Sequence, residues 1–161
     1  MIDPNPSLLA FFHCADNLKE DERRQFEALS GEPYLPDYWA ARLYAAPGPK
    51  LGCIGRDGLP VAVGGYALVR PGVWDMWMLS TPHAWPKSVV EITRGVLNSM
   101  NILAAKGAHR IECISLADRF MAHRWYRALN LRRESPVPQW GANGEDAIQF
   151  AWVRDHDERQ Y

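Results

Sequence analysis

The sequence contains few cysteines, and no two of them stand at a spacing typical of a disulfide framework or a metal site. The three cysteines of this 161-residue chain are Cys14, Cys53 and Cys113. Disulfide-stabilised secreted domains use more, and free cysteine is usually a small buried hydrophobe. We therefore predict three buried thiols in a reducing compartment and keep a catalytic thiol only as the alternative.

Long apolar runs and an excess of one charge are also lacking. No run approaches the roughly 20 residues that span a bilayer, and Met1–Pro4 lacks the basic and apolar regions of a secretory signal. The formal net charge is -1, whereas binding to nucleic acid needs a basic face. We predict no membrane span, no secretion signal and no general nucleic-acid binding. A local basic patch is the alternative, formed by Arg119, Arg124, Arg127, Arg132 and Arg133.

Tryptophan, by contrast, is abundant, with seven residues in a short chain. Tryptophan is enriched in cores and at interfaces, so partner surfaces are a reasonable expectation. Apolar residues make up 47% of the chain, and domains commonly have about 100–150 residues. We expect one domain over residues 1–161, with its core between about 8 and 153 and a mobile polar tail at 155–161.

The first half of the chain combines short apolar segments with helical patterns. A first strand is predicted at Leu8–His13. A surface helix follows, since Leu18, Glu22, Phe26 and Leu29 recur every three or four residues. Gly31 closes this helix and Pro36 opens a second short one. Three strands are then predicted at Leu51–Ile54, Leu59–Val69 and Val73–Leu79, the first two joined by a hairpin signal at Arg56-Asp57-Gly58.

The second half begins with the strongest helical pattern, Lys87–Lys106, which is followed by a strand at Arg110–Leu116. Asp118 is predicted to cap the next helix and Asn130 to end it. The inner face of that helix is predicted to hold Met121, Ala122, Trp125, Tyr126 and Leu129. A loop at 135–146 precedes a last strand at Ala147–Val153. Strands interleaved with helices favour an α/β or α+β layered sheet.

Three segments together resemble the GNAT acetyltransferases. They are Leu116–Leu131, Met78–Pro82 leading into the long helix, and Leu59–Tyr66. The resemblance implies a central mixed, mostly antiparallel sheet with flanking helices.

A narrower resemblance is to small GNAT-like proteins of short-tailed bacteriophages, identified as internal virion protein A-like. It is carried by Ala15–Leu18, Asp21–Arg24, Ala28–Gly31, Pro60–Gly65 and Trp74–Leu79. It implies a virion-associated or assembly protein, located in the virion or the infected-host cytoplasm. Its partners would be other virion proteins, in the internal core or portal region, or a host protein.

The resemblance also implies where a cofactor would bind. GNAT enzymes hold the CoA pyrophosphate on backbone N–H groups of a glycine-rich turn at a helix N-terminus. The three glycine positions here hold Pro86, Ser88 and Val90, and Trp85 replaces the basic residue. Proline has no N–H and valine is bulky. This favours a non-catalytic scaffold without a cofactor. The residues left for an anion are Lys87, Ser88 and Val89.

The alternative is an active N-acetyltransferase that uses acetyl-CoA. The resemblance then makes Tyr126 the general acid, and Asp75 or a water the base. In the non-catalytic interpretation Tyr126 is a core aromatic and Asp75 a solvent-facing strand residue. His13 and His123 lack a carboxylate or metal-spaced partner, so no metal site is predicted. A cleft between the fourth and fifth strands filled by Trp85 or Val90 would exclude the cofactor.

Overall fold

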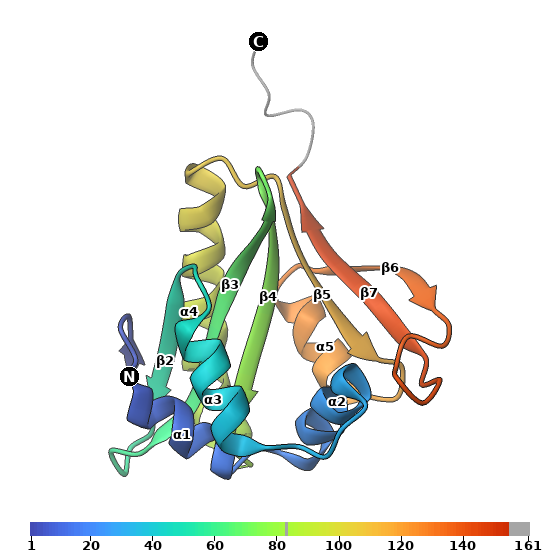
Figure 1. Cartoon of the computed structure of the whole chain (residues 1–161). Helices are drawn as coiled ribbons and strands as arrows, with labels where there is room; N and C mark the ends of the chain where they lie inside the picture. Colours follow the sequence, from blue (N-terminus) through green and yellow to red (C-terminus); the bar gives the residue numbers. More distant parts are fainter. Residues whose placement is uncertain (83, 155–161) are drawn as a thin grey trace.

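A computed structural model describes residues 1–82 and 84–154, with the backbone alone at 84–86. One seven-stranded sheet, in the order β1-β2-β3-β4-β5-β7-β6, runs through the molecule (Figure 1). The elements are β1 (Ile2–Asp3), α1 (Leu8–Asp16), α2 (Glu20–Ser30), α3 (Pro36–Ala45), β2 (Lys50–Ile54), β3 (Pro60–Arg70), β4 (Val73–Ser80), α4 (Ala84–Ala105), β5 (Arg110–Leu116), α5 (Phe120–Ala128), β6 (Arg132–Val137) and β7 (Ala147–Val153).

The sheet is mixed and mostly antiparallel, which confirms the predicted fold class. All neighbouring strands pair antiparallel except β4 and β5, which are parallel. In Figure 1 these two strands separate toward the end where α2 lies. The hairpin at 56–58, the start of α3 at Pro36 and both strands around the long helix α4 are as predicted.

Two apolar cores lie on opposite faces of the sheet. On the rear face, α4 and α5 cover a core that includes Tyr66, Ile111 and Phe150. The Tyr66 hydroxyl donates to the carbonyl oxygen of Val96 in α4 at 3.3 Å. On the front face, α1, α2 and α3 cover a smaller core around Phe11. All three cysteines are free and buried, which confirms the predicted burial of the thiols.

The prediction of a first strand at Leu8–His13 is wrong, because this segment lies in α1. The Ser7 side chain caps the helix by accepting from the N–H of Ala10. Its buried residues Ala10, Phe11, Cys14 and Ala15 recur at helical spacing. A short apolar run does not distinguish a strand from a buried helix face.

Two predictions for the second half of the chain are also wrong. Asp118 does not cap α5. The N-cap residue is Arg119, whose side chain makes no capping hydrogen bond, and Asp118 instead pairs with Arg24 of α2 at 2.5 Å. Met121 is 73% exposed, while the other four residues of the predicted inner face are buried. Asn130 has the predicted left-handed conformation, with φ of 60°.

Part of the segment predicted as a loop is the edge strand β6. It pairs with β7 through an irregular register between Arg133 and Ser135. Its side chains are mostly exposed and include a proline, as is typical of an edge strand. In the sequence the same two features favoured a loop. The tail at 155–161 lies outside the described residues. Among the described helices, none is long and apolar enough to cross a membrane.

Candidate functional site

The divergence of β4 and β5 opens a cavity through the sheet. Their parallel register ends at Asp75 opposite Glu112. Beyond that point lies a cavity of about 220 Å³, lined mainly by apolar groups from both faces of the sheet. Its rear wall includes Ile92, Val96, Trp125 and Tyr126, and its front wall includes Phe26, Leu29, Trp77 and Trp140.

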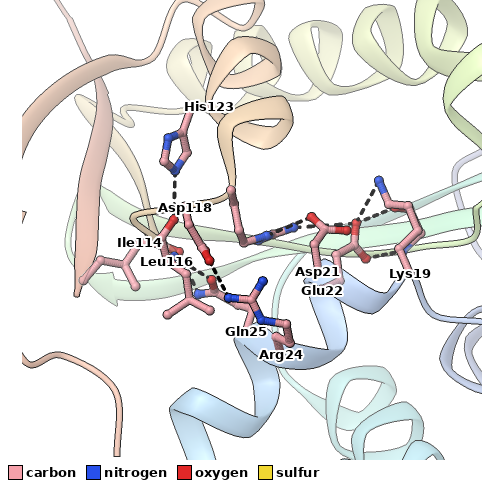
Figure 2. A network of polar contacts seen from close by, with 11 residues as sticks. Lys19, Asp21, Glu22, Arg24, Gln25, Ile114, Leu116, Asp118 and His123 are labelled. Atoms are coloured by element: carbon pink, nitrogen blue, oxygen red, sulfur yellow. Dashed lines mark hydrogen bonds and ion pairs between the residues drawn. The ribbon is translucent and has the colours of Figure 1, made fainter. Parts of the chain in front are cut away.

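The edge of β5 that faces this cleft is closed by a glutamine of α2. The Gln25 side-chain amide donates to the carbonyl oxygen of Ile114 at 3.1 Å and accepts from the N–H of Leu116 at 2.8 Å. Figure 2 shows the contact of His123 with Leu116, in which Nε2 of the ring lies 3.0 Å from the carbonyl oxygen of Leu116. Burial lowers the pKa of His123, so the neutral ring donates this bond. Side chains thus replace a neighbouring strand along β5.

The facing edge of β4 is occupied at its ends and open between them. The N–H of Ser80 donates to Glu22 at 2.7 Å, and the carbonyl oxygen of Ser80 accepts from the N–H of Lys19 at 3.1 Å. Strand residues alternate in direction, so the backbone groups of Met78 and Met76 also face the cleft. The N–H of Met76 lies beside the Asp75 carboxyl. In the described part of the chain, Met78 therefore keeps its backbone amide directed into the cleft without a partner on β5.

Glu22 also belongs to a buried ionic cluster at the wide end of the cleft (Figure 2). Its carboxylate is 4% exposed, accepts from Ser80 Oγ at 2.5 Å, and lies 3.5 Å from Lys19 Nζ and 4.0 Å from Arg119 Nη2. Arg119 in turn pairs with Asp21 at 3.0 Å. Burial raises the pKa of Glu22 and lowers that of Lys19. The cluster ties α2 to β4 and to the start of α5.

Asp75, the candidate base, lies on the front side of the cleft where the strands part. Burial raises the pKa of Asp75 to about 6, with the charge of Glu112 adding to the shift and the N–H of Met76 opposing it. Glu112 is itself paired with Arg110. Asp75 is partly buried and lines the cavity, so it is not a simple solvent-facing strand residue. A carboxylate of this pKa is ionised at pH 7 and suited to accept a proton.

Tyr126, the candidate acid, lines the rear wall. It is 8% exposed and packs against the rings of Trp125 and Phe150, with ring centroids 5.9 and 5.1 Å away. Burial raises the pKa of its hydroxyl, which keeps the proton in place. The core position of Tyr126 is therefore compatible with a role as proton donor.

The candidate anion-binding residues lie in the first turns of α4 and are not among those that line the cavity. Lys87 is exposed, Ser88 is buried, and Val89 packs partly buried against the rear core. The N–H groups at a helix start attract anions. Lys87 and this helix end are the electrostatic features that an anion would meet.

The glycine-replacing residues do not fill the cleft where they are described. Val90 is 58% exposed on α4, and the side chains of Trp85 and Pro86 lie outside the described residues. Val90 therefore does not plug the cleft, and the condition that would exclude the cofactor is not met at this residue. The chain retains the cleft and lacks the glycines.

The predicted basic patch loses one member, because Arg119 is buried in the ionic cluster. Of the other four arginines, Arg124 and Arg127 are exposed on α5, and Arg132 and Arg133 are exposed on β6. Among the described residues, no group of three or more His, Cys, Asp or Glu is arranged to hold a metal ion.

The sequence did not single out Glu22 and Gln25 as functional residues. One signal was present: Glu22 occupies a position of the apolar stripe of its helix, where a carboxylate is unexpected. Gln25 gave no signal, because a glutamine on a charged helix is typical of a solvated face.

Comparison with known proteins identifies the fold. No protein family matches the sequence, and no curated protein is significantly similar to it. Solved structures match over nearly the whole chain. An acetyltransferase of the GNAT family from Bacillus anthracis has a TM-score of 0.71 at 10% identity, covering 94% of this chain and 93% of that one. The ribosomal-protein-S18-alanine N-acetyltransferase from Escherichia coli has a TM-score of 0.68 at 15% identity, covering 100% and 98%. The chain has the GNAT acetyltransferase fold.

Proposed function

We propose that this chain with the GNAT fold is an N-acyltransferase that transfers an acyl group, acetyl from acetyl-CoA in the first instance, to an amine. The observation that carries this proposal is the open cleft through the sheet. It has a carboxylate of pKa about 6 on its front side and a buried tyrosine hydroxyl in its rear wall. Two groups with opposite proton preferences, reached from opposite faces, suit transfer between two substrates.

The residues of the chain have separate tasks in this proposal. Asp75 accepts a proton from the ammonium form of the acceptor, which exposes the nitrogen lone pair. The freed nitrogen attacks the thioester carbonyl carbon, and the C–S bond breaks as the C–N bond forms. Tyr126, which is protonated because it is buried, donates its proton to the leaving thiolate and is reprotonated by the second proton that the acceptor nitrogen loses. The backbone amide of Met78 orients the thioester arm by hydrogen bonding to an amide of that arm. Acetyl-CoA supplies the activated acyl group.

The fit of acetyl-CoA differs between its two ends. The apolar cleft and the open backbone amide of Met78 suit the pantetheine arm. At the pyrophosphate end, Pro86 has no N–H to donate, and side chains stand where glycine would let phosphates approach. The helix dipole and Lys87 remain as electrostatic partners. We expect binding through the arm and weaker binding of the phosphates.

Calorimetry with acetyl-CoA, followed by an acetyl-transfer assay on an amine panel, tests the proposal. We expect a measurable dissociation constant and transfer that falls at least about tenfold in Asp75→Asn and Tyr126→Phe. Phe120→Ala, an exposed substitution on α5, is the matched control and keeps full activity. Absence of heat at millimolar acetyl-CoA, with a folded protein, rejects the acyltransferase.

The second candidate is a virion-associated or assembly protein of a bacteriophage, built on a GNAT scaffold without catalysis. It is favoured by the replaced glycines and by the use of the Ser80 N–H by Glu22 instead of a ligand. In this proposal the partners are other virion proteins of the internal core or portal region, or a host protein. Detection of the protein in purified particles, and failed assembly after deletion of its gene, would support it. Particles that lack the protein and assemble normally without its gene reject this candidate.

A further inference from the structure

The front mouth of the cleft is apolar and largely aromatic. Four side chains form it: Phe26 and Leu29 of α2, Trp77 of β4, and Trp140 of the loop between β6 and β7. Leu29 is 55% exposed, although it stands on the apolar stripe of its helix. An exposed leucine beside two tryptophans at the entrance of a cavity is typical of a binding surface.

These walls come from separate elements that other contacts hold in place. The Trp77 indole lies directly on Gly65 of β3, where an added Cβ would come within 2.6 Å of the ring. The loop carrying Trp140 is joined to α2 by a bond from the N–H of Ala142 to the carbonyl oxygen of Ala28, at 2.8 Å. The mouth is therefore built before a ligand arrives, which lowers the entropy lost on binding.

Among the described residues that line the cavity, the carboxylates are those of Glu22 and Asp75. Glu22 is held by Ser80 and Lys19. Glu112, beside Asp75, is paired with Arg110. In the described part of the chain, Asp75 forms no ion pair, and it lines the cavity. A single ammonium group fits this arrangement, whereas a polycation would leave its other charges against apolar walls.

We infer that the acceptor is a monoamine whose primary ammonium group is carried by an aromatic or bulky apolar body. The ammonium group meets Asp75, and the body lies between Trp77, Leu29 and Trp140. The assignment of this ligand as an acceptor rests on the proposed function, whereas its binding to the mouth does not.

Calorimetry on the whole chain without acetyl-CoA tests the binding directly, with 2-phenylethylamine, ethanolamine and spermidine as probes. We expect 2-phenylethylamine to bind at least about tenfold more tightly than either other amine, because burial of a ring contributes a factor of this size or more. Tighter binding of spermidine or ethanolamine than of 2-phenylethylamine overturns the inference. So does binding of none of the three.

Variants locate the binding. Trp140→Ala and Leu29→Ala are expected to weaken 2-phenylethylamine binding about fivefold or more and to leave ethanolamine binding within about twofold. Asp75→Asn is expected to weaken binding of both amines, since it removes the charge. Leu68→Ala, which removes an exposed leucine away from the cavity, is the control and changes neither. Equal effects of Leu68→Ala and Trp140→Ala contradict the proposed position.

The transfer assay separates the two proposals. Binding of 2-phenylethylamine without acetyl transfer rejects the acyltransferase and keeps the amine site. Transfer to spermidine or ethanolamine at the higher kcat/KM rejects the acceptor class and keeps the acyltransferase.

Discussion

The two strand edges that face each other across the cleft are occupied differently. Along β5, Gln25 and His123 satisfy the backbone groups that a neighbouring strand would otherwise take. Along β4, side-chain contacts occupy the end at Ser80, and Met78 stays open. Buried backbone groups are rarely left without partners. In the proposed reaction a ligand with amide groups pairs with β4, and β5 serves as a fixed wall.

The side-chain contacts that Glu22 makes with β4 and Gln25 makes with β5 both come from α2. Glu22 and Gln25 are three residues apart, so they share one face of the helix, and each reaches a different strand. The helix thus holds the two strands apart. Substitutions at Glu22 and Gln25 remove these contacts one at a time.

Removing Glu22 should have the largest effect. Glu22→Ala leaves Lys19 and Arg119 with less charge compensation and the N–H of Ser80 unpaired, so we expect a loss of about 3–5 kcal/mol in the free energy of unfolding. Urea unfolding at pH 7 measures it. Glu20→Ala, an exposed change on the same helix, is the control and should stay within about 0.5 kcal/mol. A similar small loss for Glu22→Ala would show that the cluster contributes little.

Removing Gln25 should cost less, because it is uncharged. Gln25→Ala leaves the carbonyl oxygen of Ile114 and the N–H of Leu116 without their partner, and we expect a loss of about 1–3 kcal/mol. Hydrogen exchange should show faster exchange of the Leu116 amide and little change in β7. Unchanged protection of Leu116 would mean that β5 does not need this contact.

Asp75 should make stability and activity depend on pH. Its pKa is raised from 3.8 to about 6, so its stabilising contribution is complete below about pH 3.8 and is lost as the pH rises through about 6. We expect Asp75→Asn to gain about 1–2 kcal/mol relative to the original chain between pH 4 and pH 7. Parallel stability curves for the two proteins would contradict the raised pKa. In the proposed reaction, transfer by the original chain should increase with pH through the same range.

The donor comparison should show the smallest effect. S-acetyl-N-acetylcysteamine carries the thioester arm without the phosphates. If the arm pairs with β4 and the phosphates contribute little binding free energy, this donor should reach a kcat/KM within about tenfold of that of acetyl-CoA. Initial rates with each donor at saturating amine measure this. A preference for acetyl-CoA above a hundredfold would show that the phosphates are bound strongly without the glycines.

Local patterns predicted much of the fold. The α4 pattern, the hairpin at 56–58 and the bounds of β5 and β7 agree with the structure, because amphipathic periodicity and turn residues act over short distances. The pattern at Leu8–His13 failed, because a short apolar run suits a strand or a helix face equally. The edge strand β6 was missed because its exposed residues show no alternation.

The candidate site was only partly predictable. Asp75 and Tyr126 were named through a family resemblance, and the structure brings both to one cavity. Gln25 was not named, because its role depends on Ile114 and Leu116, about 90 residues away. No local sequence pattern indicates a contact between residues so far apart in the chain.

The sequence by itself determined the periodic elements and the buried cysteines, since these follow from residue type and short-range spacing. The absence of glycine at Pro86, Ser88 and Val90 is visible in the sequence too, but only the GNAT resemblance makes it notable. Only the tertiary structure decided that β4 and β5 diverge after Asp75 and that α2 fills the far end of the gap. The physical reason is that long-range pairing chooses which backbone groups are satisfied by strands and which by side chains. That choice left the cleft open, whatever residues stand at the start of α4.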